Sequence, residues 1–156
     1  MNEPGPYSKT EKWNFLMAVC GEEGVLGNPS RRWMKIWTEG GTTLEKFYEF
    51  IEEILMDIGP AGPGNWVCFT MDNLNVHKNP GVLALIHAYG HGVCFRAPYY
   101  AIDGPIEYIF NTLQGLIRSR LYEIYDSRSL LAVISQSIQS INDFSCYFRC
   151  CGFIHN

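Results

Sequence analysis

The chain has 156 residues, 47% of them hydrophobic, with six cysteines and a formal net charge of −4. This length predicts a single domain with its own core, and the acidic balance gives no overall electrostatic reason to bind nucleic acid. We expect no signal peptide, because residues 1–12 contain no apolar h-region. We expect no membrane span, because no apolar run approaches about 18 to 20 residues. Six scattered cysteines without an export signal are typical of reduced thiols.

Two strands are predicted near the N-terminus. Residues 13–20 form a short apolar run, and residues 32–38 alternate, with Trp33, Lys35 and Trp37 on one face. A Gly- and Pro-containing segment separates the two runs. This pattern predicts an antiparallel hairpin.

An amphipathic helix is predicted next, over residues 44–58. Its N-cap is Thr42 or Thr43, and the spacing from Thr42 to Glu45 is that of a capping box. The predicted buried stripe comprises Leu44, Phe47, Phe50 or Ile51, Ile54, Leu55 and Ile58. The opposite face, which we interpret as solvated surface, carries Glu45, Glu49, Glu52 and Glu53.

A strand–helix–strand unit is predicted over residues 67–71, 80–89 and 93–97. Asn79 or Asn75 opens the helix, and Pro80 suits its first turn. The first strand lacks clean alternation, which predicts a central strand covered on both faces. Short connections between these elements predict a parallel crossover.

The C-terminal third predicts two further helices. The first runs from Pro105 to about Tyr125, and the second from Ser129 to Ile141. The predicted buried stripe of the first helix comprises Ile106, Ile109, Phe110, Leu113, Ile117, Leu121 and Ile124.

Two carboxylates flank the strand–helix–strand unit, with 34 residues between them. Asp72 directly follows an apolar strand, and ligands of open α/β sheets bind at the carboxyl ends of strands. Glu107 is expected in the first turn of a helix, where the helix dipole favours an ionised carboxylate. Together the two acids could hold a hard divalent ion for phosphodiester cleavage. The structural alternatives are an Asx-type turn at Asp72 and a bond from Glu107 to the helix start.

The segment from Met71 to Glu107 resembles the core of DDE-superfamily endonucleases, the mariner-like transposases and their bacterial insertion-sequence relatives. In that family a strand ends in Asp-Asn, a His-Lys pair follows, a later strand ends in Pro-Tyr, and the loop closes on Asn-Pro-Ile-Glu. The residues that carry the resemblance here are Asp72, Asn73, His77, Lys78, Pro98, Tyr99, Gly104, Pro105, Ile106 and Glu107. The segment upstream also looks like the family's second and third strands and first helix, so the resemblance covers most of the chain.

The resemblance implies an RNase H-like fold, a mixed sheet flanked by helices. It implies a single domain over residues 1–156, with a core at 13–125 and a C-terminal helix and tail at 126–156. Asp72 would be the second catalytic carboxylate and Glu107 the third, together binding magnesium or manganese. Accessory or DNA-contacting roles fall to Asn73, His77, Lys78, Arg96, Asn111 and Arg118.

Two features depart from the family pattern. The family's Pro-Tyr-Ser-Pro-Asp-Leu-Asn loop is replaced by residues 98–104 of this chain. Its first aspartate follows an earlier strand, and Glu3, Glu11 and Asp57 do not fit that place. We therefore expect an N-terminally truncated RNase H-like sheet that lacks its first, central strand, and a transposon-derived endonuclease domain that is inactive in this chain.

The resemblance also suggests partners and location. Transposon-end DNA is the expected partner. A homodimer is one possible assembly, and no membrane partner is expected. The chain would act in the nucleus of a eukaryote and otherwise in the cytoplasm. The first alternative function is a non-catalytic, domesticated or relic interaction module. The second is a small zinc-binding protein, whose ligands would be Cys146, Cys150, Cys151 and His155.

Overall fold

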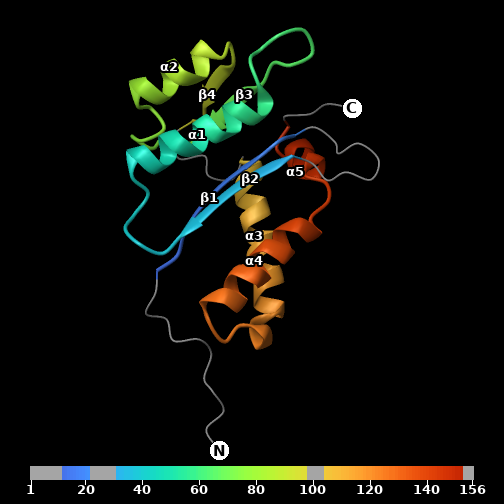
Figure 1. Ribbon diagram of the computed structural model, residues 1–156. Coiled ribbons are helices and arrows are strands. Elements are labelled where there is room, and N and C mark those ends of the chain that lie inside the picture. The colour runs from blue at the N-terminus through green and yellow to red at the C-terminus, as the bar shows by residue number, and fades with distance from the viewer. Residues whose placement is uncertain (1–11, 22–30, 98–103, 153–156) are drawn as a thin grey trace, which may run out of the picture. The chain divides into compact units, whose positions relative to one another are not determined.

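The computed structural model describes residues 12–21, 31–97 and 104–152, and combines helices with two small sheets (Figure 1). It divides into two compact units. Among the described residues, one unit holds 13–16 and 34–97, and the other holds 12, 17–21, 31–33 and 104–152. Each unit is described by itself. The predicted α/β class is confirmed at this level.

The N-terminal strands are β1 (Asn14–Val19) and β2 (Arg32–Trp37), which pair as a two-stranded sheet. Beyond the end of β1, the Cys20 N–H donates to the Arg31 carbonyl oxygen at 2.9 Å. The end of β1 therefore lies beside the start of β2, as in an antiparallel hairpin. Both strands lie within two residues of their predicted bounds.

Helix α1 (Leu44–Ile58) has the predicted bounds, and its apolar stripe forms the core of its unit. Burial of this stripe stabilises the helix, because each fully buried aliphatic or aromatic side chain contributes about 1.5 to 3 kcal/mol. Leu44, which was predicted to be buried, is instead 43% exposed because it lies at the first helical position. The buried residues are Phe47, Phe50, Ile51, Ile54, Leu55 and Ile58.

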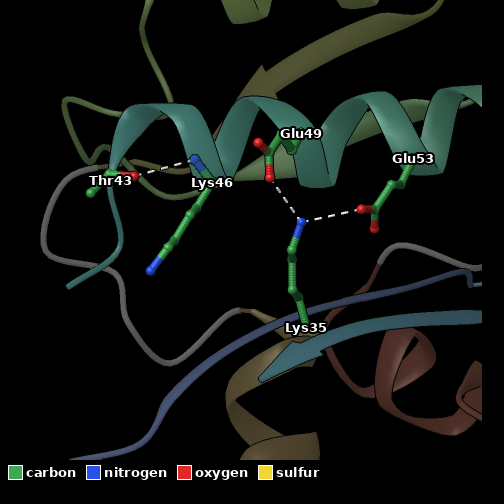
Figure 2. A network of polar contacts seen from close by, with 5 residues as sticks. All are labelled: Lys35, Thr43, Lys46, Glu49 and Glu53. Atoms are coloured by element: carbon green, nitrogen blue, oxygen red, sulfur yellow. Dashed lines mark hydrogen bonds and ion pairs between the residues drawn. The ribbon is translucent and has the colours of Figure 1, made fainter. Parts of the chain in front are cut away.

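The N-cap of α1 is Thr43, whose Oγ1 accepts a hydrogen bond from the Lys46 N–H at 3.3 Å (Figure 2). The predicted capping box of Thr42 and Glu45 is therefore wrong by one residue. Thr43 has the extended backbone that an N-cap requires, and its hydroxyl is three residues before the N–H that it binds.

Replacing Thr43 by alanine is expected to destabilise the protein by about 1 kcal/mol, because the Lys46 N–H loses its acceptor. Thr42→Ala is the matched control, since the neighbouring threonine is exposed and lies outside the cap. Urea unfolding followed by circular dichroism measures both variants. Equal losses in the two variants would show that the cap lies elsewhere.

The acidic face of α1 is bound by a lysine of β2 (Figure 2). Lys35 Nζ lies 3.2 Å from Glu49 Oε2 and 3.1 Å from Glu53 Oε1. Burial lowers the pKa of Lys35, but the hydrogen bonds to Glu53 and Glu49 outweigh it, so that this pKa is raised. Both glutamates are about 60% exposed, and such surface pairs contribute about 0 to 1 kcal/mol each. The predicted solvated face is thus also a docking face for β2.

The strand–helix–strand unit is present as β3 (Cys68–Met71), α2 (Pro80–Ala88) and β4 (Gly92–Phe95). β3 and β4 pair in parallel, with Cys68 opposite Gly92 and Met71 opposite Phe95, as predicted. α2 packs against α1 and β4 (Figure 1). The carboxyl ends of both strands therefore lie at one edge of this small sheet.

One prediction about β3 is wrong. Its side chains alternate: Cys68 and Thr70 are exposed, whereas Phe69 and Met71 are partly buried. The strand is therefore covered more on one face than on the other. The period of two was not recognised in the sequence, because the exposed positions carry Cys68 and Thr70 rather than charged residues.

The other unit contains α3 (Pro105–Ser119), a short 3₁₀ helix η2 (Leu121–Glu123), α4 (Ser127–Ser140) and α5 (Ser145–Cys150). α3 packs against α4 and α5, and η2 packs against α3 and α4. The apolar side chains with the least exposure in this core are Ile109, Leu113, Val133, Ile138 and Phe144.

The predicted helix from Pro105 to Tyr125 ends early, at Ser119. The chain has to turn for α4 to pack on α3, and Arg120 stabilises this turn by contacting Glu123 at 2.8 and 2.6 Å and Gln136 at 2.6 Å. Leu121 is consequently 53% exposed rather than buried. In the part of the chain that the structure describes, no helix has the length and apolar character needed to cross a membrane.

Candidate functional site

Asp72 directly follows β3, at the carboxyl edge of the parallel β3–β4 pair. Its side chain is 43% exposed. One carboxylate oxygen, Oδ1, lies 2.5 Å from His77 Nδ1 and accepts a long bond, 3.4 Å, from the Leu74 N–H. The bond from the Leu74 N–H closes an Asx-type turn, which was one of the alternatives in the sequence analysis. The contact with His77 is additional, and it also holds the carboxylate in place.

Asn73 joins the two strand ends. Its Nδ2 donates a short hydrogen bond to the Arg96 carbonyl oxygen, and the Arg96 N–H donates to the Met71 carbonyl oxygen at 2.9 Å. The contacts at Arg96 just after β4 therefore hold the Asp72 loop to the neighbouring strand. Asn73 acts here through its side-chain amide and Arg96 through its backbone, which identifies both as parts of the scaffold around Asp72.

His77 lies in the turn between β3 and α2. Its ring centroid is 4.6 Å from that of Phe47 in α1, and its side chain is 16% exposed. The next residue, Lys78, is exposed, with Nζ 6.0 Å from the centre of the Phe95 ring. Asn79 caps α2 through a bond of 2.9 Å from the Gly81 N–H to Oδ1. The loop that carries Asp72 is thus held by α1, α2 and β4.

His91 lies near the other end of β3, and the sequence analysis did not recognise its role. It is 3% exposed. Its Nε2 lies 2.8 Å from the Gly59 carbonyl oxygen, and its Nδ1 accepts from the Val67 N–H at 3.4 Å. The imidazole therefore links the end of α1 to the residue before β3. The only local sign of this role is a histidine between two glycines.

Glu107 is the third residue of α3, in the unit of residues 104–152. It is partly buried, and its N–H donates to the Gly104 carbonyl oxygen at 3.1 Å. Asn111, Gln114 and Arg118 are exposed along α3, away from its buried positions. The predicted placement of Glu107 in the first helical turn is confirmed.

Asp72 and Glu107 belong to different units, so their predicted convergence stays a prediction. Within each unit the donor chemistry suits a hard ion, because carboxylate oxygen is the ligand that Mg²⁺ prefers in proteins. At Asp72, no hydrogen bond among residues 12–21, 31–97 and 104–152 occupies Oδ2. Mg²⁺ usually takes about one or two protein carboxylates and keeps several waters.

The described residues contain no group of three or more His, Cys, Asp or Glu side chains that could hold a metal ion. Cys146, Cys150 and Cys151 lie in or beside α5 and form no disulfide among the described residues. His155, the fourth predicted zinc ligand, lies outside the described residues, as do Pro98 and Tyr99 of the motif. The structure thus gives the zinc alternative no ligand cluster within its described part.

Comparison with models of protein families, with curated proteins and with solved structures gave no match for this chain.

Proposed function

We propose that this chain is a transposon-derived DDE endonuclease domain with an RNase H-like fold. Asp72 and Glu107 would be two of its metal-binding carboxylates, with DNA as the substrate. The observation that carries the proposal is the position of Asp72. Asp72 lies at the carboxyl end of a strand that has a parallel neighbour, and its side chain is exposed. The loop that carries it contacts α1, α2 and β4. The sequence resemblance names the same residue.

The strand pairing gives further support. In an RNase H-like sheet the first strand lies between the second and the fourth. If β1 and β2 correspond to the second and third strands, and β3 and β4 to the last two, leaving out the first strand yields an antiparallel pair and a parallel pair. The described residues form two such separate pairs.

Asp72 and Glu107 would hold magnesium or manganese through carboxylate oxygens. Such ions activate a bound water and stabilise the leaving oxygen of a phosphodiester. The protein's own contribution is to fix the carboxylates beforehand. Asn73 and His77 do this for Asp72, and the first turn of α3 does it for Glu107, where the helix dipole favours a negative charge. Lys78 and Arg118, both exposed, are the proposed contacts for DNA phosphates.

The test is Mn²⁺ binding, followed by the electron paramagnetic resonance signal of the free ion. If both acids bind the same ion, Asp72→Asn and Glu107→Gln should each weaken that binding at least about tenfold. Asp57→Asn and Glu52→Gln are matched controls on the exposed surface of α1, and they should leave the affinity unchanged. An affinity that neither Asp72→Asn nor Glu107→Gln alters would overturn the proposal.

Cleavage needs more than these two acids. Glu3, Glu11 and Asp57 do not fit the place of the family's first aspartate. We therefore propose that Asp72 and Glu107 bind the ion without cutting DNA. A supercoiled plasmid should stay intact with Mg²⁺. Nicking that disappears in Asp72→Asn would mean that the catalytic set is complete in this chain.

A further inference from the structure

His77 presents one ring nitrogen to two oxygens of the same residue. Nδ1 lies 2.5 Å from Asp72 Oδ1 and 3.3 Å from the Asp72 carbonyl oxygen. Both oxygens are acceptors, so Nδ1 must carry a proton for either contact to be favourable. His77 is therefore the donor, and Asp72 is its acceptor.

The imidazole has little freedom to leave this position. Its side chain is only 16% exposed, and its ring is tilted by 36° against Phe47, which is 4% exposed in the core. The backbone is fixed as well, because the His77 N–H donates to the Leu74 carbonyl oxygen at 3.0 Å. The position of the donor is therefore set by the α1 core and by the turn after β3.

The two oxygens of the Asp72 carboxylate are not equivalent. Oδ1 takes the His77 N–H and the Leu74 N–H, whereas Oδ2 has no hydrogen bond within the described residues and belongs to an exposed side chain. An unrestrained aspartate would lose rotamer freedom on binding an ion. Here the hydrogen bonds within the loop have already removed that freedom.

We propose that His77 is a positioning residue, which holds Asp72 Oδ1 so that Oδ2 is presented to a divalent ion. This inference rests on the proposed function, because it assigns a partner to a metal-binding carboxylate. It also changes the role expected for His77. The ring donates to a carboxylate of its own loop, so we do not propose it as a direct contact for DNA phosphate.

Two substitutions separate positioning from packing. His77→Phe keeps a ring beside Phe47 but has no N–H, whereas His77→Asn keeps an N–H near the place of Nδ1 but has no ring. Groups that hold metal ligands typically contribute about 10- to 100-fold to metal affinity. We therefore expect His77→Phe to weaken Mn²⁺ binding by that factor, and His77→Asn to stay close to wild type. His87→Phe, on the exposed side of α2, is the control.

A reversed order, with His77→Phe like wild type and His77→Asn weak, would overturn the inference, because affinity would then follow ring packing. Thermal unfolding of each variant shows whether a loss of affinity is a loss of folded protein. If Asp72→Asn abolishes binding and His77→Phe does not, the inference fails alone. If Asp72→Asn changes nothing, the proposed function fails and the inference with it.

A second measurement needs no metal. Nitrogen-15 NMR of the imidazole in the full chain should show the proton of His77 on Nδ1, and Asp72→Asn should shift the Nδ1 resonance. His87 provides the reference spectrum of an exposed ring. A neutral His77 with its proton on Nε2 alone would overturn the inference whatever the Mn²⁺ result, because Nδ1 could not then donate.

Discussion

Replacing His91 by alanine is expected to lower the free energy of unfolding by about 2 to 4 kcal/mol. The substitution removes the donor to the Gly59 carbonyl oxygen and the acceptor of the Val67 N–H, and it leaves a cavity around a side chain that is 3% exposed. Urea unfolding monitored by circular dichroism measures the loss. The expected loss of stability is large because two backbone groups, the Gly59 carbonyl and the Val67 N–H, lose their partner together.

His87→Ala is the matched control for this experiment. His87 is an exposed histidine in the last turn of α2, four residues before His91, and surface substitutions usually change stability by about 0.5 kcal/mol or less. Similar losses in both variants would show that His91 does not hold the end of α1 to the start of β3. A loss of this link would also affect the candidate site, because Asp72 directly follows β3.

The elements that local sequence predicts well are those with a strong period and clear ends. α1 has both, since its apolar stripe lies between an N-cap at Thr43 and Gly59, a glycine at φ 74° that ends the helix. The starts of α2 and α3 were predicted for a similar reason, because proline suits the first turn of a helix. Pro80 and Pro105 mark both starts.

The elements that were missed depend on contacts between distant residues. α5 has only six residues, too few for a helical period, and it is held by Phe144, which is fully buried, and by a bond of 3.1 Å from the Tyr147 hydroxyl to Thr112 Oγ1. The early end of α3 depends on Gln136, sixteen residues beyond Arg120. No pattern within a short window contains this information.

In the candidate site too, local sequence predicts some features, whereas others depend on contacts between distant residues. The place of Asp72 after a strand was predicted from its neighbours, and its Asx-type turn was one of the alternatives that they allowed. The pairing with His77 needs a turn of five residues and a ring packed on Phe47, thirty residues earlier. His91 is the extreme case, because its partner Gly59 lies 32 residues away. Sequence therefore singled out Asp72 and His77 as site residues, but neither the contact between them nor the role of His91.

Leu55→Ala is expected to lower the free energy of unfolding by about 2 to 5 kcal/mol, the range for truncating a buried leucine. Leu55 has no exposed surface and lies in the apolar stripe of α1 with Phe47. Met56→Ala is the control on the next residue, since Met56 is 71% exposed. Chemical denaturation of both variants measures the difference, and equal stabilities would contradict the burial of this face of α1.

The same variant tests how the core supports the site. Phe47 packs against the ring of His77, and His77 contacts Asp72, so folding of α1 and metal binding should be linked. An ion that binds only the folded state stabilises it by mass action. Saturating Mn²⁺ should therefore raise the unfolding midpoint of Leu55→Ala as it does for wild type, but not that of Leu55→Ala combined with Asp72→Asn. A rise that persists without the Asp72 carboxylate would place the ion elsewhere.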